Sequence, residues 1–150
     1  MSNTTFDGYL RPDGSVGVRN IVAVIPSCGC AQHVARMIAA AVPGAAVVDY
    51  SGGCGETAAD LNVATQLLAQ MGRHPNVIAS LVVSLGCEGL DARDLSARIA
   101  EGWAPTELLV IQEMGGTRKT IDRGVEIVRG FVENVADYQR TSCPASSLTV

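Results

Sequence analysis

The sequence predicts an α/β fold in which a parallel β-sheet of about four strands is covered by helices on both faces. Apolar, β-branched runs alternate four times with segments whose apolar residues recur at helical spacing. The expected strands are apolar on both faces, which is typical of a parallel sheet buried between helices. The 150 residues, 47% of them hydrophobic, suit one domain with a single core. Together these observations indicate a Rossmann-like three-layer architecture.

The expected strands are short runs rich in Val, Ile and Leu. They cover residues 20–27, 45–51, 77–85 and 107–112. Because strand–helix–strand crossovers are right-handed and return the chain to the same side of the sheet, the carboxyl ends of all four strands should lie at one edge.

The expected helices follow these strands one by one. Residues 30–42 form the first helix, which a Pro-Gly pair ends. The second helix ends near residue 72, and one apolar face of it is formed by Leu61, Ala64, Leu67, Leu68 and Met71. A short third helix lies within residues 90–102, and the fourth covers residues 117–135.

Outside these elements the sequence predicts little regular structure. Residues 1–19 are predicted to be an N-terminal leader, residues 20–137 the α/β domain and residues 138–150 a tail. Residues 146–150 resemble the beginning of another strand. We therefore expect the chain to be a fragment or one part of a larger assembly, with a following segment beyond residue 150.

Composition and charge disfavour several classes of partner. The net charge is −4 and no run of Lys or Arg occurs, so a nucleic-acid partner is not expected. No apolar stretch approaches the ~20 residues that a membrane span needs, and the N-terminus lacks the features of a secretory signal. We expect a cytoplasmic protein, in which five cysteines are ligands, nucleophiles or buried residues rather than a disulfide framework.

Three cysteines follow three of the expected strands, each in a glycine-containing turn. Cys30 lies in "SCGC", Cys54 in "SGGCG" and Cys87 in "LGCEG". A single such cysteine is most simply a small buried residue. Three at equivalent places favour a shared site, because ligands of open parallel sheets bind beyond the carboxyl ends of the strands.

Three thiolates favour a soft metal, either zinc or iron in an iron–sulfur cluster. Structural zinc usually has four ligands in C-x-x-C pairs, whereas this chain has a C-x-C; Cys28 would have to complete the set. A [4Fe–4S] cluster held by three cysteines leaves one iron free to act as a Lewis acid on a hydroxy acid, as in hydro-lyases of the aconitase type. The spacing does not distinguish such a cluster from a mononuclear iron site.

Several motifs resemble those of the altronate/galactarate dehydratase family. From about Phe6 onward these are "GYLRPDGSVGVRNIVAVIPSCGCAQHVA", "SGGCG", "HPNVIASLVVSLGCEG" and "IQEMGGTRKTIDRG". They match the first part of the large catalytic region of that family. Its members dehydrate hexarates and hexonates, a relative with two subunits eliminates sulfite from sulfolactate, and the family's activity is linked to iron.

The resemblance implies roles for individual residues. Cys30, Cys54 and Cys87 match the family's strand-end cysteines and are the implied ligands of iron, as Fe²⁺ or [4Fe–4S]. The implied substrate-binding positions are Arg19, Asn20, Gly115, Gly116 and Thr117. The family often has Asn at the position of Gly29 and His at that of Tyr50, so the identity of the substrate is not carried over.

The resemblance also implies partners. These are a small hydroxy-acid or sugar-acid substrate and either the remaining catalytic region or a second subunit. Assembly into a homo-oligomer is compatible with the same family.

Elimination of water from a hydroxy acid also needs an anion clamp, a base and an acid. Arg118 and Lys119, at the start of a helix, are predicted to bind substrate because guanidinium groups and helix N-termini attract carboxylates. His33 and Glu88, beside the proposed cysteine site, are the candidate catalytic groups. Arg11 is expected to be a solvated surface charge.

Two other classes of function stay open. A domain that binds a nucleotide or phosphorylated ligand is expected to carry G-x-G-x-x-G after its first strand, which "SCGCAQH" does not supply. A zinc or thiol-redox protein usually carries C-x-x-C. The sequence therefore favours a domain or subunit of an iron-dependent hydro-lyase that removes water or sulfite.

Overall fold

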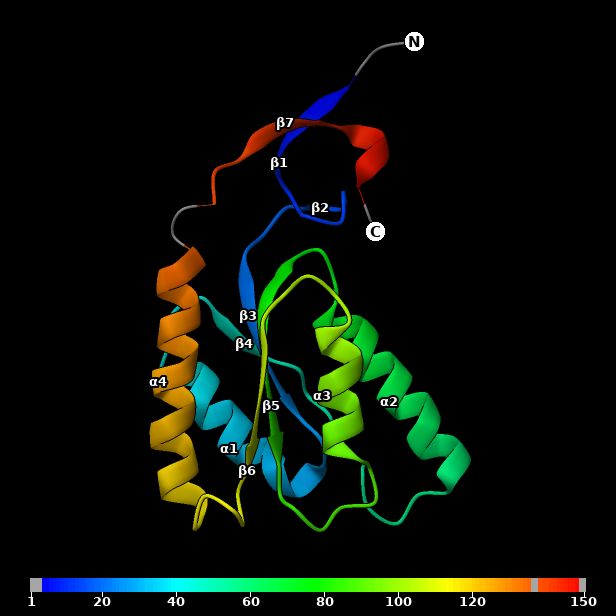
Figure 1. The fold of residues 1–150 in the computed structure, drawn as a ribbon, viewed down its shortest axis with the longest axis vertical. Coiled ribbons are helices and arrows are strands. Elements are labelled where there is room, and N and C mark those ends of the chain that lie inside the picture. The colour runs from blue at the N-terminus through cyan, green and yellow to red at the C-terminus, as the bar shows by residue number, and fades with distance from the viewer. Residues whose placement is uncertain (1–3, 136–137, 149–150) are drawn as a thin grey trace.

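The computed structural model describes residues 4–135 and 138–148, and it has the predicted α/β fold. Four parallel strands form the main sheet in the order β4-β3-β5-β6 (Figure 1). Their bounds are Ile21–Pro26 for β3, Ala45–Val47 for β4, Val77–Ser84 for β5 and Thr106–Val110 for β6. The strand predicted over residues 45–51 is therefore shorter than expected, although Val48 N–H still donates to Val24 of β3 at 2.9 Å.

Four helices cover the two faces of this sheet. They are α1 (Gly29–Ala40), α2 (Ala58–Gly72), α3 (Ala92–Ala100) and α4 (Thr117–Val135). The chain runs from β3 outward to β4 and then back across β3 to β5, so right-handed crossovers place α1 on the face opposite α2 and α3. Helix α4 packs beside α1 and completes the first face (Figure 1).

Alternating side chains of the central strands form two cores. Val22 and Val24 of β3 pack with Ile38 and Val128 on the α1–α4 face. Ala23 and Ile25 pack with Leu95, Ile99 and Leu68 on the α2–α3 face. All eight residues of β5 are buried, which explains why this segment is a continuous apolar run.

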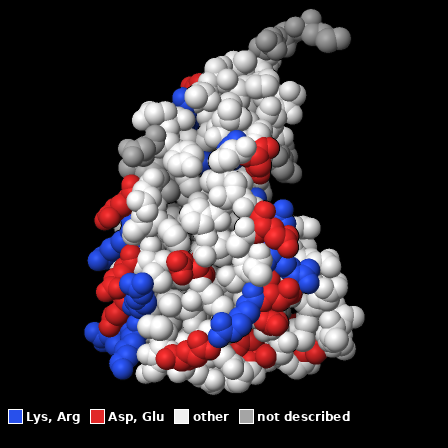
Figure 2. All heavy atoms as spheres, viewed as in Figure 1, with Lys and Arg blue, Asp and Glu red and all other residues white. Residues whose placement is uncertain are grey.

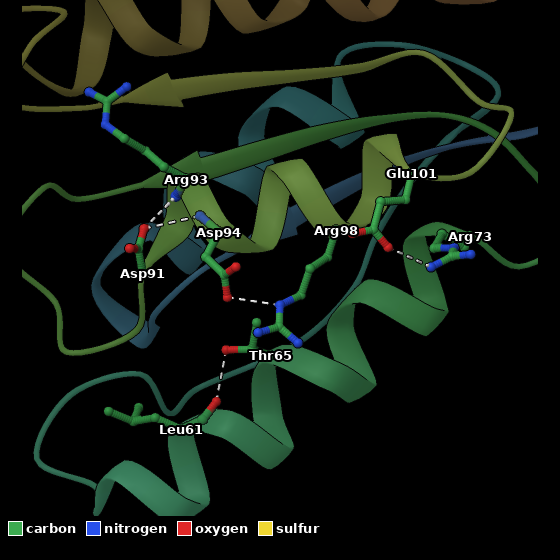
Figure 3. Close-up of polar contacts among 8 residues, drawn as sticks. All are labelled: Leu61, Thr65, Arg73, Asp91, Arg93, Asp94, Arg98 and Glu101. Carbon is green, nitrogen blue, oxygen red and sulfur yellow. Dashed lines mark hydrogen bonds and ion pairs between the residues drawn. The ribbon is translucent and has the colours of Figure 1, made fainter.

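Polar side chains on α2 and α3 form local contacts, one of which joins the two helices (Figure 3). Arg73 at the end of α2 pairs with Glu101 at the end of α3 at 3.4 Å, and Arg98 pairs with Asp94 within α3 at 2.8 Å. Asp91 begins α3 by accepting hydrogen bonds from the backbone N–H groups of Arg93 and Asp94.

The apolar face predicted for α2 is only partly correct. Leu68 and Ala69 are buried, but the side chains of Leu67 and Met71 are 55% and 49% exposed. The hydrophobic pattern of α2 is wider than the surface that α3 and the sheet cover, so sequence periodicity placed both residues in the core.

The two ends of the chain form a second sheet that the sequence did not predict. Strands β1 (Thr5–Leu10), β2 (Val16–Gly17) and β7 (Thr141–Pro144) are antiparallel in the order β2-β1-β7, at the end of the molecule away from the loops that follow β3 and β5 (Figure 1). Ala145–Ser147 form a 3₁₀ turn where the start of a strand was expected, and residues 149–150 lie outside the described part. These strands are short and partly exposed, and β1 pairs with a segment far away in sequence, so no local pattern marks them.

Arg11 is not the solvated surface charge that was expected, because it is only 2% exposed. Its Nε–H donates to Pro75 O at 2.8 Å, and its Nη2 donates to Arg19 O at 2.8 Å and to Asn20 Oδ1 at 2.9 Å. The guanidinium also stacks on the Trp103 ring at 4.9 Å from its centroid. Burial lowers the pKa of Arg11 from its ordinary value. The residue thus ties β1 to the amino end of the main sheet.

On the face shown in Figure 2, basic and acidic side chains are interspersed and form no extended patch of one sign. None of the described helices is long and apolar enough to cross a membrane.

We expect Arg11→Lys to lower the free energy of unfolding by about 2 kcal/mol, because an ammonium group cannot replace the planar fork that serves three acceptors. Arg36→Lys is the matched control, since Arg36 makes an exposed ion pair with Asp49 and should change stability by less than about 0.5 kcal/mol. Urea unfolding followed by the fluorescence of Trp103 measures both. Equal effects of the two substitutions would contradict the assigned role of Arg11.

Candidate functional site

The candidate site lies at the carboxyl edge of the main sheet, where β3 and β5 are neighbours. The helix after β3 and the helix after β5 pack on opposite faces, so the chain diverges between these two strand ends. Such a switch point is the usual place for a ligand in an open α/β sheet. In Figure 1 this edge is at the lower end of the molecule.

Three loops meet at this edge, and each carries one of the predicted cysteines. Gly29 N–H, next to Cys30, donates to Gly52 O at 2.9 Å. Gly53 O, next to Cys54, accepts from Gly89 N–H at 2.8 Å and from Leu90 N–H at 3.1 Å, just after Cys87. The loop after β4 is therefore bonded through its backbone to the loops after β3 and β5.

Close approach of these backbones requires glycine at two positions. Gly53 has φ +92°, and a Cβ atom there would lie 2.3 Å from Ser27 O. A Cβ atom on Gly29 would lie 2.6 Å from Ser51 O. Both contacts are far shorter than a carbon atom tolerates, so a larger residue at either position would require the neighbouring loop of this chain to shift.

Glu88 holds the ends of β3 and β5 together. Its Oε1 accepts from the hydroxyls of Ser27, at the end of β3, and of Ser84, at the end of β5, the latter at 2.5 Å. Its Oε2 accepts from the backbone N–H groups of Gly86 at 2.7 Å and Cys87 at 3.0 Å. Both serines are buried, whereas Gly86 and Cys87 are exposed, so the half-buried carboxylate has two donors on its inner side and two in its own surface turn.

These donors keep Glu88 ionised. Burial by itself would raise the pKa of the carboxyl, but the hydrogen bonds from Ser27, Ser84 and the Gly86 backbone outweigh it and hold the pKa below its usual range. The geometry gives Glu88 a positioning role for the turn that carries Cys87. Its predicted catalytic role stays a prediction.

Tyr50 and Glu56 hold the Cys54 loop in a similar way. Glu56 Oε2 accepts from Gly53 N–H at 2.7 Å and from the hydroxyl of Tyr50 at 3.1 Å. Burial and the bond to Glu56 raise the pKa of Tyr50 to about 12, so the phenol stays protonated. Sequence analysis missed this pair and Ser27; the signal that could have found Ser27 is the serine that ends each of the two central strands, Ser27 after β3 and Ser84 in β5.

The thiols of Cys30, Cys54 and Cys87 are exposed at this edge, whereas Cys28 is buried at the start of α1. Burial raises the pKa of Cys28, which makes it the poorer thiolate donor. Within residues 4–135 and 138–148, no three Cys, His, Asp or Glu side chains lie close enough to hold a metal ion. The loops are thus brought together, while the three sulfur atoms are not grouped around one point.

Several other predicted residues share this edge. His33 lies exposed on the first turns of α1. Gly115 and Gly116, both with positive φ, precede α4, and the exposed Thr117, Arg118 and Lys119 form its first turn. Arg118 makes only a loose ion pair with Asp122 at 3.6 Å, and its side chain is 90% exposed.

Arg19 and Asn20 lie at the opposite edge, before β3. Asn20 Oδ1 is bonded to Arg11, and the segment before β3 forms β1 and β2 at that far end. The structure therefore separates these two residues from the cysteine loops, and their predicted contact with substrate stays a prediction.

A surface hollow of about 340 Å³ adjoins the Glu88 turn. It lies between the carboxyl ends of β5 and β6 and the start of α3, and its lining includes Ser84, Glu88, Arg93 and Glu113. Its size suits a small ligand. It could not be predicted from the sequence, because its lining comes from two segments, residues 84–93 and residues 110–113, that meet only in the fold.

We expect Glu88→Gln to lower the free energy of unfolding at pH 7 by about 1–2 kcal/mol, because an amide replaces a carboxylate that accepts four hydrogen bonds. The folded-state pKa of Glu88 lies below the ordinary 4.5, so its contribution is complete above about pH 4.5 and is lost as the pH falls through the folded-state pKa. The difference between wild type and variant should shrink over that range. Urea unfolding at pH 7, 5, 4 and 3.5 measures it.

Glu101→Gln serves as the control for this experiment, since Glu101 makes an exposed ion pair with Arg73. It should change stability by less than about 0.5 kcal/mol at pH 7. A Glu88→Gln variant as stable as the control would show that Glu88 does not hold the loop.

The sequence model of the family described as "D-galactarate dehydratase/Altronate hydrolase, second domain" matches residues 8–136. The altronate dehydratase of Bacillus subtilis (strain 168) is 27% identical over 160 residues, covering 99% of this chain and 31% of that protein. The (2R)-sulfolactate sulfo-lyase subunit beta of Chromohalobacter salexigens is 31% identical over 150 residues, covering 100% of this chain and 38% of that protein.

A third relative, the altronate dehydratase of Escherichia coli (strain K12), is 36% identical over 90 residues, which cover 53% of this chain and 18% of that protein. The chain thus spans about a third of the length of the first two relatives. The match to the family extends over most of the chain and includes all three cysteine loops and the start of α4. The chain therefore belongs to the D-galactarate dehydratase/altronate hydrolase family, of which it carries the second domain.

Proposed function

We propose that the chain is a domain or subunit of a lyase that eliminates water, or sulfite, from a small hydroxy acid or sugar acid. The relatives are named as dehydratases and a sulfo-lyase subunit, and the chain matches their second domain. The observation that carries the proposal is the joining of three cysteine loops at the switch point of the sheet. Such an edge is where an α/β domain holds its substrate.

Cys30, Cys54 and Cys87 are proposed to hold iron, as Fe²⁺ or as a [4Fe–4S] cluster. The donor chemistry fits, because three exposed thiols on loops bonded to one another are soft ligands in a place that solvent and substrate reach. The described side chains do not yet surround one point, so a common site requires the sulfur atoms to draw closer. Bound iron supplies a Lewis acid for a hydroxyl or carboxylate oxygen.

The residues of the chain have distinct tasks in this proposal. The glycine turn before α4, with Thr117, Arg118 and Lys119, binds a substrate carboxylate through the helix N-terminus and two cations. His33, exposed on α1, is the candidate group for proton transfer. Glu88 positions the Cys87 turn, since its carboxylate oxygens are already occupied by four donors.

We expect Cys30→Ser, Cys54→Ser and Cys87→Ser to lower the iron content of the complete enzyme, purified without oxygen, at least ~10-fold. Lyase activity on hydroxy acids should fall in parallel. Cys143→Ser is the matched control, because Cys143 is buried in β7, in the second sheet, and should leave both readings unchanged. Iron analysis and a lyase assay measure the outcome.

An active enzyme without iron would overturn the metal part of the proposal and leave the lyase part standing. Stoichiometric zinc in place of iron would favour the zinc reading of the three cysteines. Loss of iron in the Cys143 variant as well would show that the effect is one of folding rather than of ligation.

Arg118→Ala should raise KM for the acid substrate roughly 10-fold and change kcat little, because it removes one charged hydrogen-bonding group from binding. Arg123→Ala is the control on the same helix, since Arg123 pairs with Glu126 at 3.0 Å further along α4. Steady-state kinetics of the complete enzyme measure both. Equal KM values for the two variants would exclude Arg118 from the anion clamp.

A further inference from the structure

An apolar stripe on α2 is left uncovered by the described residues. Val63, Leu67 and Met71 are 55%, 55% and 49% exposed. They are spaced four residues apart and therefore lie on one side of the helix, over roughly 12 Å of its length. Scattered exposed hydrophobic residues are common, but three in a row on one helix face mark a surface that another element covers.

Two apolar hollows adjoin this stripe and continue it onto the sheet. One, of about 320 Å³, is lined by Val63, Leu67 and Met71 with Tyr50. The other, of about 280 Å³, runs along the sheet and is lined by Ala46, Val48 and again Met71. Because Met71 lines both, they form one groove, here named the α2–β4 groove and defined by Val63, Leu67, Met71, Ala46 and Val48.

The topology explains why this groove is open. Strand β4 is at the edge of the sheet, and its Ala45 and Val47 pack under α1 on one face. Ala46 points to the other face, where α2 leans toward α3 and β5 and leaves the β4 side uncovered. Strands of a parallel sheet are ordinarily buried on both faces, so a covering element is missing over β4.

The lining of the groove favours an apolar occupant. No Lys or Arg lines either hollow, and its two acidic residues already have partners. Asp49 pairs with Arg36 at 3.0 Å, and Asp60 accepts from the hydroxyl of Thr57 at 2.7 Å. The surface therefore offers mainly apolar contact, with Asp60, His74 and Asn76 as further polar residues in its lining.

We infer that the α2–β4 groove is the docking surface for the remaining polypeptide of the enzyme, which covers it with an apolar helix or strand. The chain spans 31% and 38% of two relatives that it matches almost throughout, so most of such an enzyme lies outside it. The family match names this part as the second domain, which implies neighbouring domains. The inference rests on family membership and not on the proposed chemistry.

The two methionines of similar exposure provide the test. Met71 in the groove is 49% exposed and Met37 on α1 is 46% exposed. In the complete enzyme under dilute hydrogen peroxide, we expect Met71 to be oxidised at least ~10-fold more slowly than Met37, as mass spectrometry of peptides measures. Oxidation of the two at similar rates would overturn the inference. The same measurement at lower protein concentration separates identical copies of the complete polypeptide. If the protection of Met71 is lost on this dilution, the occupant of the groove is a second copy, and the inference is overturned.

A pair of substitutions tests the same surface by stability. Leu67→Glu should lower the melting temperature of the complete enzyme by about 4 °C or more, because it places a charge in a covered groove. Met37→Glu, at a position of similar exposure, should change it by less than about 1 °C. Equal melting temperatures of the two variants would overturn the inference. Neither readout depends on activity, so failure of the proposed lyase function would leave it intact.

Discussion

The carboxylate of Glu88 is the interaction on which the candidate site depends. Strands β3 and β5 end side by side, where Ser27 N–H donates to Val83 O at 2.9 Å, and the helices that follow them pack on opposite faces of the sheet. Glu88 bridges a serine from each strand and also binds two backbone N–H groups of its own turn. One side chain thereby fixes the position of Cys87 relative to the start of α1 and Cys30. A charge with four donors is stable there, while an apolar residue would remove an acceptor from the hydroxyls of two buried serines.

The third cysteine loop joins this arrangement through backbone contact. Gly53 approaches Ser27 so closely that its carbonyl oxygen reaches the N–H groups after Cys87. Glu56 and Tyr50 then hold the loop from its outer side. The exposed thiols thus project from loops that are bonded to one another through their backbones. This combination suits a site that must both hold a ligand and admit it.

The main sheet and its helices could be predicted from sequence because their signals are local. A buried strand such as β5 is apolar throughout, and α4 begins and ends where its pattern does. The pairing of β1 with β7, the burial of Arg11 and the four bonds to Glu88 could not be predicted, because each joins segments distant in sequence. The positions of the cysteines could be predicted only in part. The topology places their loops at one edge of the sheet, whereas the distances between the sulfur atoms depend on side-chain rotamers that no sequence pattern encodes. The apolar face of α2 is wider than the surface that the described residues cover, so the prediction that Leu67 and Met71 lie in the core was wrong. The exposure of these two residues marks the uncovered groove.

The pairing of β1 with β7 has a consequence for how such a domain is combined with others. Residues near both ends of the described chain run side by side, at the end of the molecule opposite the cysteine loops. Any polypeptide joined to the start of β1 and to the end of β7 is therefore attached within one small region of the surface. A unit attached in this manner can be inserted into a longer chain, or separated from it as an independent gene product, without rerouting the backbone through the edge that carries the cysteine loops. The matched stretch occurs both in a protein named as a dehydratase and in one named as a sulfo-lyase subunit.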